Sequence, residues 1–165
     1  MAAALTDRRI FMKPEEMRYC SGGEVHLPFH GSTFTGLKFL YNEYGYEAVD
    51  EVLTATGQKV YKSIHERLKN GDTSELLCFW RYYLEREKCD FTLTENSDGT
   101  AVLELRECPA MRQLAVENIP DPDGLLCYGT EKLNQAWCEN SPFEIVVEHL
   151  EKGCRQTLRR KGDEK

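Results

Sequence analysis

The spacing of apolar residues changes once along the chain, near residue 90, and this change constrains the fold more than any other feature. Between about residues 32 and 87, apolar side chains recur every three or four positions, as on one face of an amphipathic helix. From residue 91, Phe91 and Leu93 alternate with Thr92 and Thr94, the period-two pattern of a half-buried strand. Helices followed by alternating strands predict an α+β fold, with N-terminal helices packed on an antiparallel sheet.

Capping residues and glycines divide the first half into three predicted helices. The first begins after Ser32 or Thr33 and ends at Gly45. The second runs over about residues 46–69 and contains Gly57, where glycine costs about 1 kcal/mol relative to alanine; a packing or kinking reason is therefore expected. A capping box over residues 72–75 opens the third helix, which extends to about residue 87. The later elements are two hairpins with short helices between them: strands at 91–94 and 101–106, a helix opening at Pro109, a helix from about Thr130 to Cys138, and strands at 143–148 and 154–160.

The chain of 165 residues has the length of one domain. Prolines and glycines in residues 1–31 predict an irregular N-terminal segment or lid, followed by a single α+β domain over 32–160 and a frayed tail over 161–165. His26 and His30 would face one metal if they lay on a helix, but Pro28 and Gly31 argue against a helix there. His30 alone, beside the first predicted helix, is therefore the functional candidate.

Composition restricts the partners and the compartment. The formal net charge of −7 argues against a nucleic-acid partner or an anionic membrane. No apolar segment resembles a signal peptide or a membrane span. Seven cysteines without a CxxC pair fit reduced thiols in the cytoplasm better than a disulfide framework. We therefore expect a soluble cytoplasmic domain, able to form a homo-oligomer, whose partner is a small-molecule substrate or ligand.

Four cysteines in the last third of the chain are the candidates for a site: Cys108, Cys127, Cys138 and Cys154. Cys108 precedes Pro109, a residue favoured at the start of a helix, and Cys127 lies just before the predicted cap of the next helix. A thiol at a helix N-terminus has a lowered pKa, so the pattern predicts thiolates at a shared site. The alternative is that these cysteines are small buried apolar residues.

Three kinds of cysteine site fit this pattern. A thiolate could attack an electrophilic carbon while a histidine moves the proton. The thiolates, with or without His30, could instead bind a soft divalent metal, although spacings of 19, 11 and 16 residues match no zinc finger. They could also line an apolar ligand cavity. Asn134, four residues before Cys138 on the same helix edge, could orient a substrate or donate to an oxyanion, or make only a structural hydrogen bond.

Several motifs together resemble the L-2-amino-thiazoline-4-carboxylic acid hydrolase-like family over roughly residues 30 to 160. They are His30-x6-Leu37-Lys-Phe-Leu-Tyr-x-x-Tyr-Gly45, Glu107-Cys-Pro-Ala110, Cys127-x-x-Thr130-x-x-x-Asn134-x-Ala136 and Gly153-Cys-Arg155. The resemblance implies hydrolysis of a cyclic amidine in a cysteine-lined pocket.

The resemblance also suggests roles for individual residues. His30 would be the general base, Cys127 the nucleophile or a metal ligand, and Cys108, Asn134 and Cys138 the pocket wall. Arg155 is the candidate anchor for the substrate carboxylate, its alternative being a solvated strand arginine. The cofactor is left open, with a divalent metal as the candidate. The family is also similar in architecture to vinyl-reductase-like ligand-binding domains, so a non-catalytic sensor or binding domain is the alternative function. A purely structural interaction module is a third.

Overall fold

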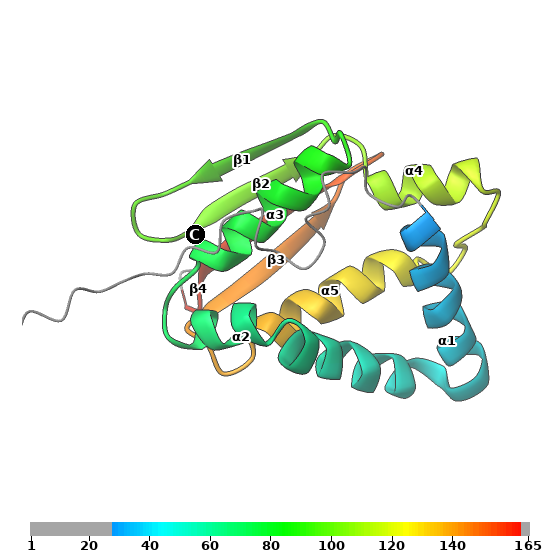
Figure 1. Ribbon diagram of the computed structural model, residues 1–165, viewed down its shortest axis with the longest axis horizontal. Coiled ribbons are helices and arrows are strands. Elements are labelled where there is room, and N and C mark those ends of the chain that lie inside the picture. Colours follow the sequence, from blue (N-terminus) through cyan, green and yellow to red (C-terminus); the bar gives the residue numbers. More distant parts are fainter. Residues whose placement is uncertain (1–27, 163–165) are drawn as a thin grey trace, which may run out of the picture.

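The computed structural model describes residues 28–162, in which helices precede and then alternate with the strands of one sheet (Figure 1). The elements in order are α1 (Pro28–Ala55), the π-helical turn η2 (Thr56–Val60), α2 (Lys62–Lys69), α3 (Ser74–Arg86), β1 (Phe91–Glu95), β2 (Ala101–Leu105), α4 (Pro109–Val116), α5 (Leu125–Cys138), β3 (Phe143–His149) and β4 (Cys154–Arg160). This arrangement confirms the predicted α+β class. Within residues 28–162, the structure contains no helix with the length and apolar character needed to span a membrane.

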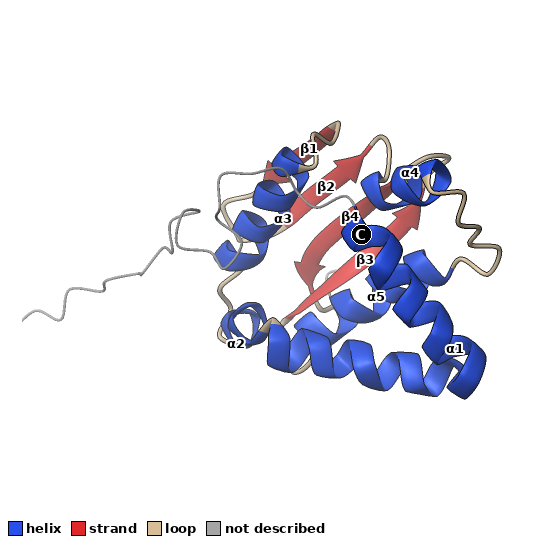
Figure 2. Ribbon diagram, turned by 45° about the vertical axis from the view of Figure 1, so that its right-hand side comes forward, coloured by secondary structure: helices blue, strands red, loops and turns tan. Residues whose placement is uncertain are grey.

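The four strands form one antiparallel sheet in the order β1-β2-β4-β3 (Figure 2). Both predicted hairpins are present, and the pairing of β2 with β4 joins them, with Leu103 opposite Gln156 and Leu105 opposite Cys154. Because side chains alternate along a strand, these four residues share one face, which we call the inner face. Glu104 and Arg155, which are also opposite each other, lie on the outer face.

The main core lies between the inner face of the sheet and helices α2, α3 and α5. Its buried side chains include Ile64, Leu68, Leu76, Trp80, Leu103, Trp137, Phe143 and Leu158. The apolar period of α3 and the alternation of β2 direct these residues to a common interior, as the sequence pattern predicts.

A second core joins α1, α4 and the start of α5. It contains Phe34, Leu37, Val49, Leu53, Leu114 and Leu125. Helix α1 crosses α5 closely at Gly129, where an added Cβ would lie 3.1 Å from a methyl carbon of Leu37. This packing places the first turn of α1 beside α4 (Figure 1).

Helix α1 begins at Pro28, so the prediction of an irregular segment is wrong for residues 28–31. Proline is well tolerated at the start of a helix because its missing N–H would have no intrahelical partner there. His30 therefore lies in the first helical turn rather than in a loop. The rest of the predicted lid, including His26, and the last residues of the predicted tail, 163–165, lie outside the described residues.

Two glycines determine the path of the chain from α1 to α2. Gly45 breaks the helix as predicted, with φ 78° and ψ −174°. Gly57 is buried in η2, where an added Cβ would lie only 2.6 Å from the Cβ of Ala136 in α5. This close approach confirms the expected packing reason. The predicted continuous helix over residues 46–69 is instead the second half of α1, a π-helical turn and α2.

Candidate functional site

Helix termini from distant parts of the sequence meet at the end of the domain where α1, α4 and α5 begin. His30, in the first turn of α1, contacts Glu87, the C-cap residue that follows α3. Arg112 of α4 donates to the backbone carbonyl of the same Glu87 at 3.3 Å. The N–H of Cys108, at the start of α4, donates to the carbonyl of Lys152 in the β3–β4 turn at 2.8 Å. We call this region the Glu87 site.

The imidazole of His30 is held by a carboxylate in a largely buried environment. Its Nε2 lies 3.0 Å from Oε1 of Glu87, and the two side chains are only 14% and 7% exposed. A carboxylate accepts hydrogen bonds, so Nε2 carries the proton in this contact. In the neutral imidazole, Nδ1 is then the nitrogen with a lone pair, which is the atom able to accept a proton.

The thiol of Cys108 lies close enough to those of Cys89, Cys127 and Cys154 to influence their pKa values. Burial raises the pKa of Cys89 to about 11, and the charge of Glu87 and the thiol of Cys108 add to the shift. Burial also raises the pKa of Cys127 to about 11 and that of Cys154, and Cys108 contributes to both shifts. The structure therefore groups Cys108 with Cys127 and Cys154, and it adds Cys89, which the sequence did not single out.

Cys127 does not have the lowered pKa that its expected position at a helix start predicted. Helix α5 begins five residues earlier than expected, at Leu125, so Cys127 lies inside its first turn. The carboxylate of Asp121 already accepts hydrogen bonds from the N–H groups of Leu125 and Leu126, at 2.8 and 3.0 Å. The positive end of the helix dipole is thus occupied by an anion, and burial favours the neutral thiol. The expectation of a resting thiolate at Cys127 is wrong.

Cys138 does not belong to the same site as Cys127. The two residues lie at opposite ends of α5, about 16 Å apart along the axis at 1.5 Å per residue. Cys138 is buried in the main core with Trp137 and Phe143, and burial raises the pKa of its thiol to about 12. Its role is that of a small apolar core residue, so its placement in the pocket wall is corrected.

The amide of Asn134 makes a buried structural contact between α5 and β4. Its Nδ2 donates to Oε1 of Gln156 at 2.9 Å, and both side chains are buried. Nε2 of Gln156 donates in turn to the sulfur of Cys154 at 3.7 Å. The structural hydrogen bond, which was the alternative for Asn134, is therefore present. Asn134 reaches the thiols only through Gln156 and fixes the strand that carries Cys154.

Arg155 lies on the outer face of the sheet, away from the thiols. Its guanidinium donates to Glu104 at 2.8 and 3.1 Å and to Glu148 at 3.5 Å. Its neighbour Cys154 points to the inner face because successive side chains of a strand alternate. The prediction that Arg155 anchors a substrate at the cysteines is wrong, and its alternative as a strand arginine holds.

Besides Cys89, Glu87 and Arg112 were missed in the sequence. Glu87 lies 57 positions from His30, and no local pattern connects them. Arg112 could have been noticed, because it lies one helical turn after Cys108 and its N–H donates to the carbonyl of that residue. Within residues 28–162, no group of three or more His, Cys, Asp or Glu side chains is arranged to hold a metal ion. A divalent metal therefore has no ligand set among the described side chains.

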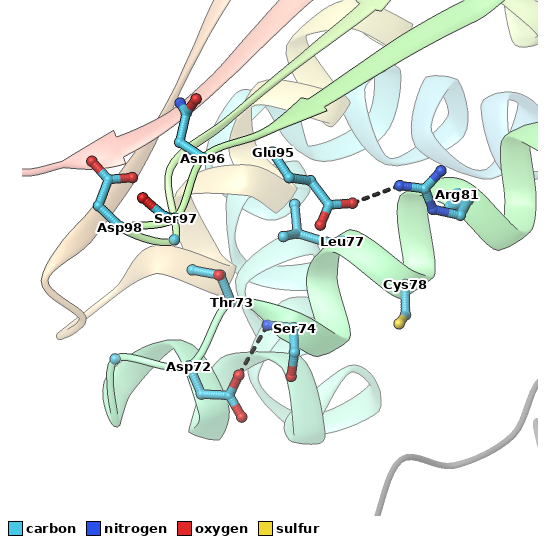
Figure 3. A pocket seen from close by; sticks show the side chains of 12 residues that line it. Asp72, Thr73, Ser74, Leu77, Cys78, Arg81, Glu95, Asn96, Ser97 and Asp98 are labelled. Atoms are coloured by element: carbon cyan, nitrogen blue, oxygen red, sulfur yellow. Dashed lines mark hydrogen bonds and ion pairs between the residues drawn. The ribbon is translucent and has the colours of Figure 1, made fainter.

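An open depression of about 490 Å³ lies at the other end of the sheet, between the start of α3 and the β1–β2 turn (Figure 3). Two pairs of its polar residues contact each other: Asp72 accepts from the N–H of Ser74 at 2.9 Å, and Arg81 pairs with Glu95 at 2.6 Å. None of the four grouped thiols lines it. This depression therefore has no part in the Glu87 site.

No protein-family model, curated protein or solved structure matches the chain.

Proposed function

We propose that the protein is a small hydrolase that opens a cyclic amidine or a related non-peptide C–N bond at the Glu87 site. The observation that carries this proposal is the largely buried pair of His30 and Glu87, with Arg112 on the backbone carbonyl of Glu87 and the charge of Glu87 acting on the thiol of Cys89. A histidine oriented by a carboxylate is a common general base. This reading agrees with the resemblance to the aminothiazoline carboxylic acid hydrolase-like family.

In the proposed reaction, water attacks the amidine carbon and Nδ1 of His30 accepts its proton. His30 returns this proton to the ring nitrogen, and the hydroxyl of the tetrahedral intermediate then gives its own proton through the same imidazole to that nitrogen as the C–N bond breaks. The carbon becomes a carbonyl, the ring nitrogen leaves as an amine, and the histidine is regenerated. General base catalysis of this kind typically contributes a factor of about 10² to 10⁴. Cys127 and Cys108 would line the site, and water rather than a thiolate is the nucleophile because burial keeps the Cys127 thiol protonated, with its pKa raised to about 11.

The second candidate is a non-catalytic ligand-binding or sensor domain, similar to vinyl-reductase-like domains. The raised pKa values of the thiols of Cys89, Cys127 and Cys154 favour this candidate. A protonated thiol is an uncharged, polarizable group that can contact a ligand but is a poor nucleophile. A purely structural interaction module has no specific observation in its favour.

The two candidates differ in turnover. The purified protein is incubated with the aminothiazoline acid in the presence of a chelator, of Mn²⁺ or of Zn²⁺, while loss of the ring is followed by chromatography. Calorimetry on the same samples measures binding. The hydrolase predicts ring loss that Glu87→Gln reduces. The control is Glu75→Gln, because Glu75 also forms an ion pair, with Arg67 at 2.8 Å, at the start of α3. Binding without ring loss under any metal condition would support the sensor domain.

A further inference from the structure

We propose that Arg112 binds the carboxylate of the substrate at the Glu87 site. Arg155 cannot fill this role because it lies on the outer face of the sheet. This inference depends on the proposed function for its substrate class, a cyclic amidine that carries a carboxylate. Such a substrate presents an anion a short distance from the reacting carbon. It therefore requires a cation beside the general base.

Arg112 and His30 are held by the same residue. The carboxylate of Glu87 binds Nε2 of His30 at 3.0 Å, and its backbone carbonyl accepts from Nη2 of Arg112 at 3.3 Å. The guanidinium is also close to the thiol of Cys89, whose pKa it lowers against the larger effect of burial. Arg112 of α4 and His30 of α1 are thus both held by Glu87, and Cys89 follows Glu87 by two residues.

The guanidinium can exchange its present partner for a ligand. Its Nη1 lies 3.2 Å from Glu107, in a pair whose side chains are 40% and 49% exposed. Ion pairs as exposed as this one stabilise a protein little, so a substrate carboxylate can replace Glu107 at small cost. A guanidinium can bind a carboxylate through two parallel hydrogen bonds, which gives both affinity and orientation.

A matched arginine lies nearby but on the other face of the sheet. Arg106 follows Leu105, an inner-face residue, and pairs with Asp90 at 3.0 Å. Both arginines form a single exposed pair with an acidic residue. Replacing either one changes the net charge equally, but of the two only Arg112 donates a hydrogen bond to Glu87 within residues 28–162.

Isothermal calorimetry tests the assignment with the aminothiazoline acid and its carboxamide as ligands. Arg112→Gln is expected to weaken binding of the acid by about tenfold to a hundredfold, the usual loss for one charged hydrogen-bonded contact. Arg106→Gln should leave the affinity unchanged, and Arg112→Lys should give an intermediate loss. The carboxamide should bind weakly to the wild-type protein and equally weakly to Arg112→Gln.

Three results would overturn the assignment: unchanged affinity of Arg112→Gln for the acid, equal losses in the Arg112 and Arg106 variants, or no binding of the acid to the wild-type protein. Thermal melting shows whether each variant is folded, and Arg112→Lys supplies the test if Arg112→Gln is not. Ring loss measured on the same samples separates the two proposals. Binding that depends on Arg112 without turnover would refute the hydrolase alone, whereas turnover with unchanged affinity in Arg112→Gln would refute the anchor alone.

Discussion

The thiol of Cys127 is expected to react slowly with iodoacetamide at pH 7, although it lies in the first turn of a helix. Burial raises its pKa from the ordinary value of 9.0 to about 11. At pH 7 the thiolate is about 1% of a thiol with the ordinary pKa and about 0.01% of Cys127, and only the thiolate is alkylated. The rate constant should therefore be about 100-fold lower in the native protein than in the unfolded chain, before any steric hindrance is added.

Timed alkylation followed by mass spectrometry of the peptides measures this ratio. Cys78, which is exposed on α3, serves as the internal reference in the native protein, and the same peptides in urea give the unfolded rates. The native rate constant of Cys127 should rise about tenfold per pH unit from pH 7 to about pH 10. Native labelling of Cys127 as fast as in urea, or a rate that levels off below about pH 8.5, would show a stabilised thiolate and restore Cys127 as a candidate nucleophile.

Two further substitutions test the packing that supports the site. Gly57→Ala should destabilise the protein by about 1–3 kcal/mol in urea unfolding, because the added Cβ would overlap Ala136. The control Gly36→Ala, whose added Cβ would have no atom within 4 Å, should stabilise the protein by about 0.4–1 kcal/mol. Unchanged stability of Gly57→Ala would contradict the close helix contact. Asn134→Ala should lower the free energy of unfolding by about 1–3 kcal/mol, because it leaves the buried oxygen of Gln156 without its donor. Replacing both residues with leucine should lower it less, and equal losses would contradict the pairing.

The architecture was predictable because the apolar spacing follows directly from how helices and strands bury one face. The alternation from Phe91 predicted the first hairpin, and Pro109 predicted the start of α4. The start of α5 was misplaced because Gly129 and Thr130 resemble a cap, whereas Asp121 caps the helix from four residues before Leu125. The sequence contains that aspartate, but its partner N–H groups are defined only by the folded loop.

The site was only partly predictable. Arg155 could have been excluded from the sequence, because it neighbours Cys154 on a predicted strand and must face the opposite side. The pairing of His30 with Glu87 could not have been predicted, since it depends on how α1, α3 and α4 pack at one end of the domain. The raised pKa of Cys127 likewise follows from burial, which no local pattern of residues specifies.

The most direct test of the account is the rate of ring loss from the aminothiazoline acid catalysed by His30→Asn relative to wild type. His149→Asn is the matched control, because His149 also pairs with a glutamate but lies on the surface, with its side chain 53% exposed. If His30 is the general base, its replacement should lower the rate by about 10²- to 10⁴-fold, and the control should keep the wild-type rate. Equal rates in the two folded variants would contradict a catalytic His30, and no ring loss by the wild-type protein would contradict the hydrolase itself.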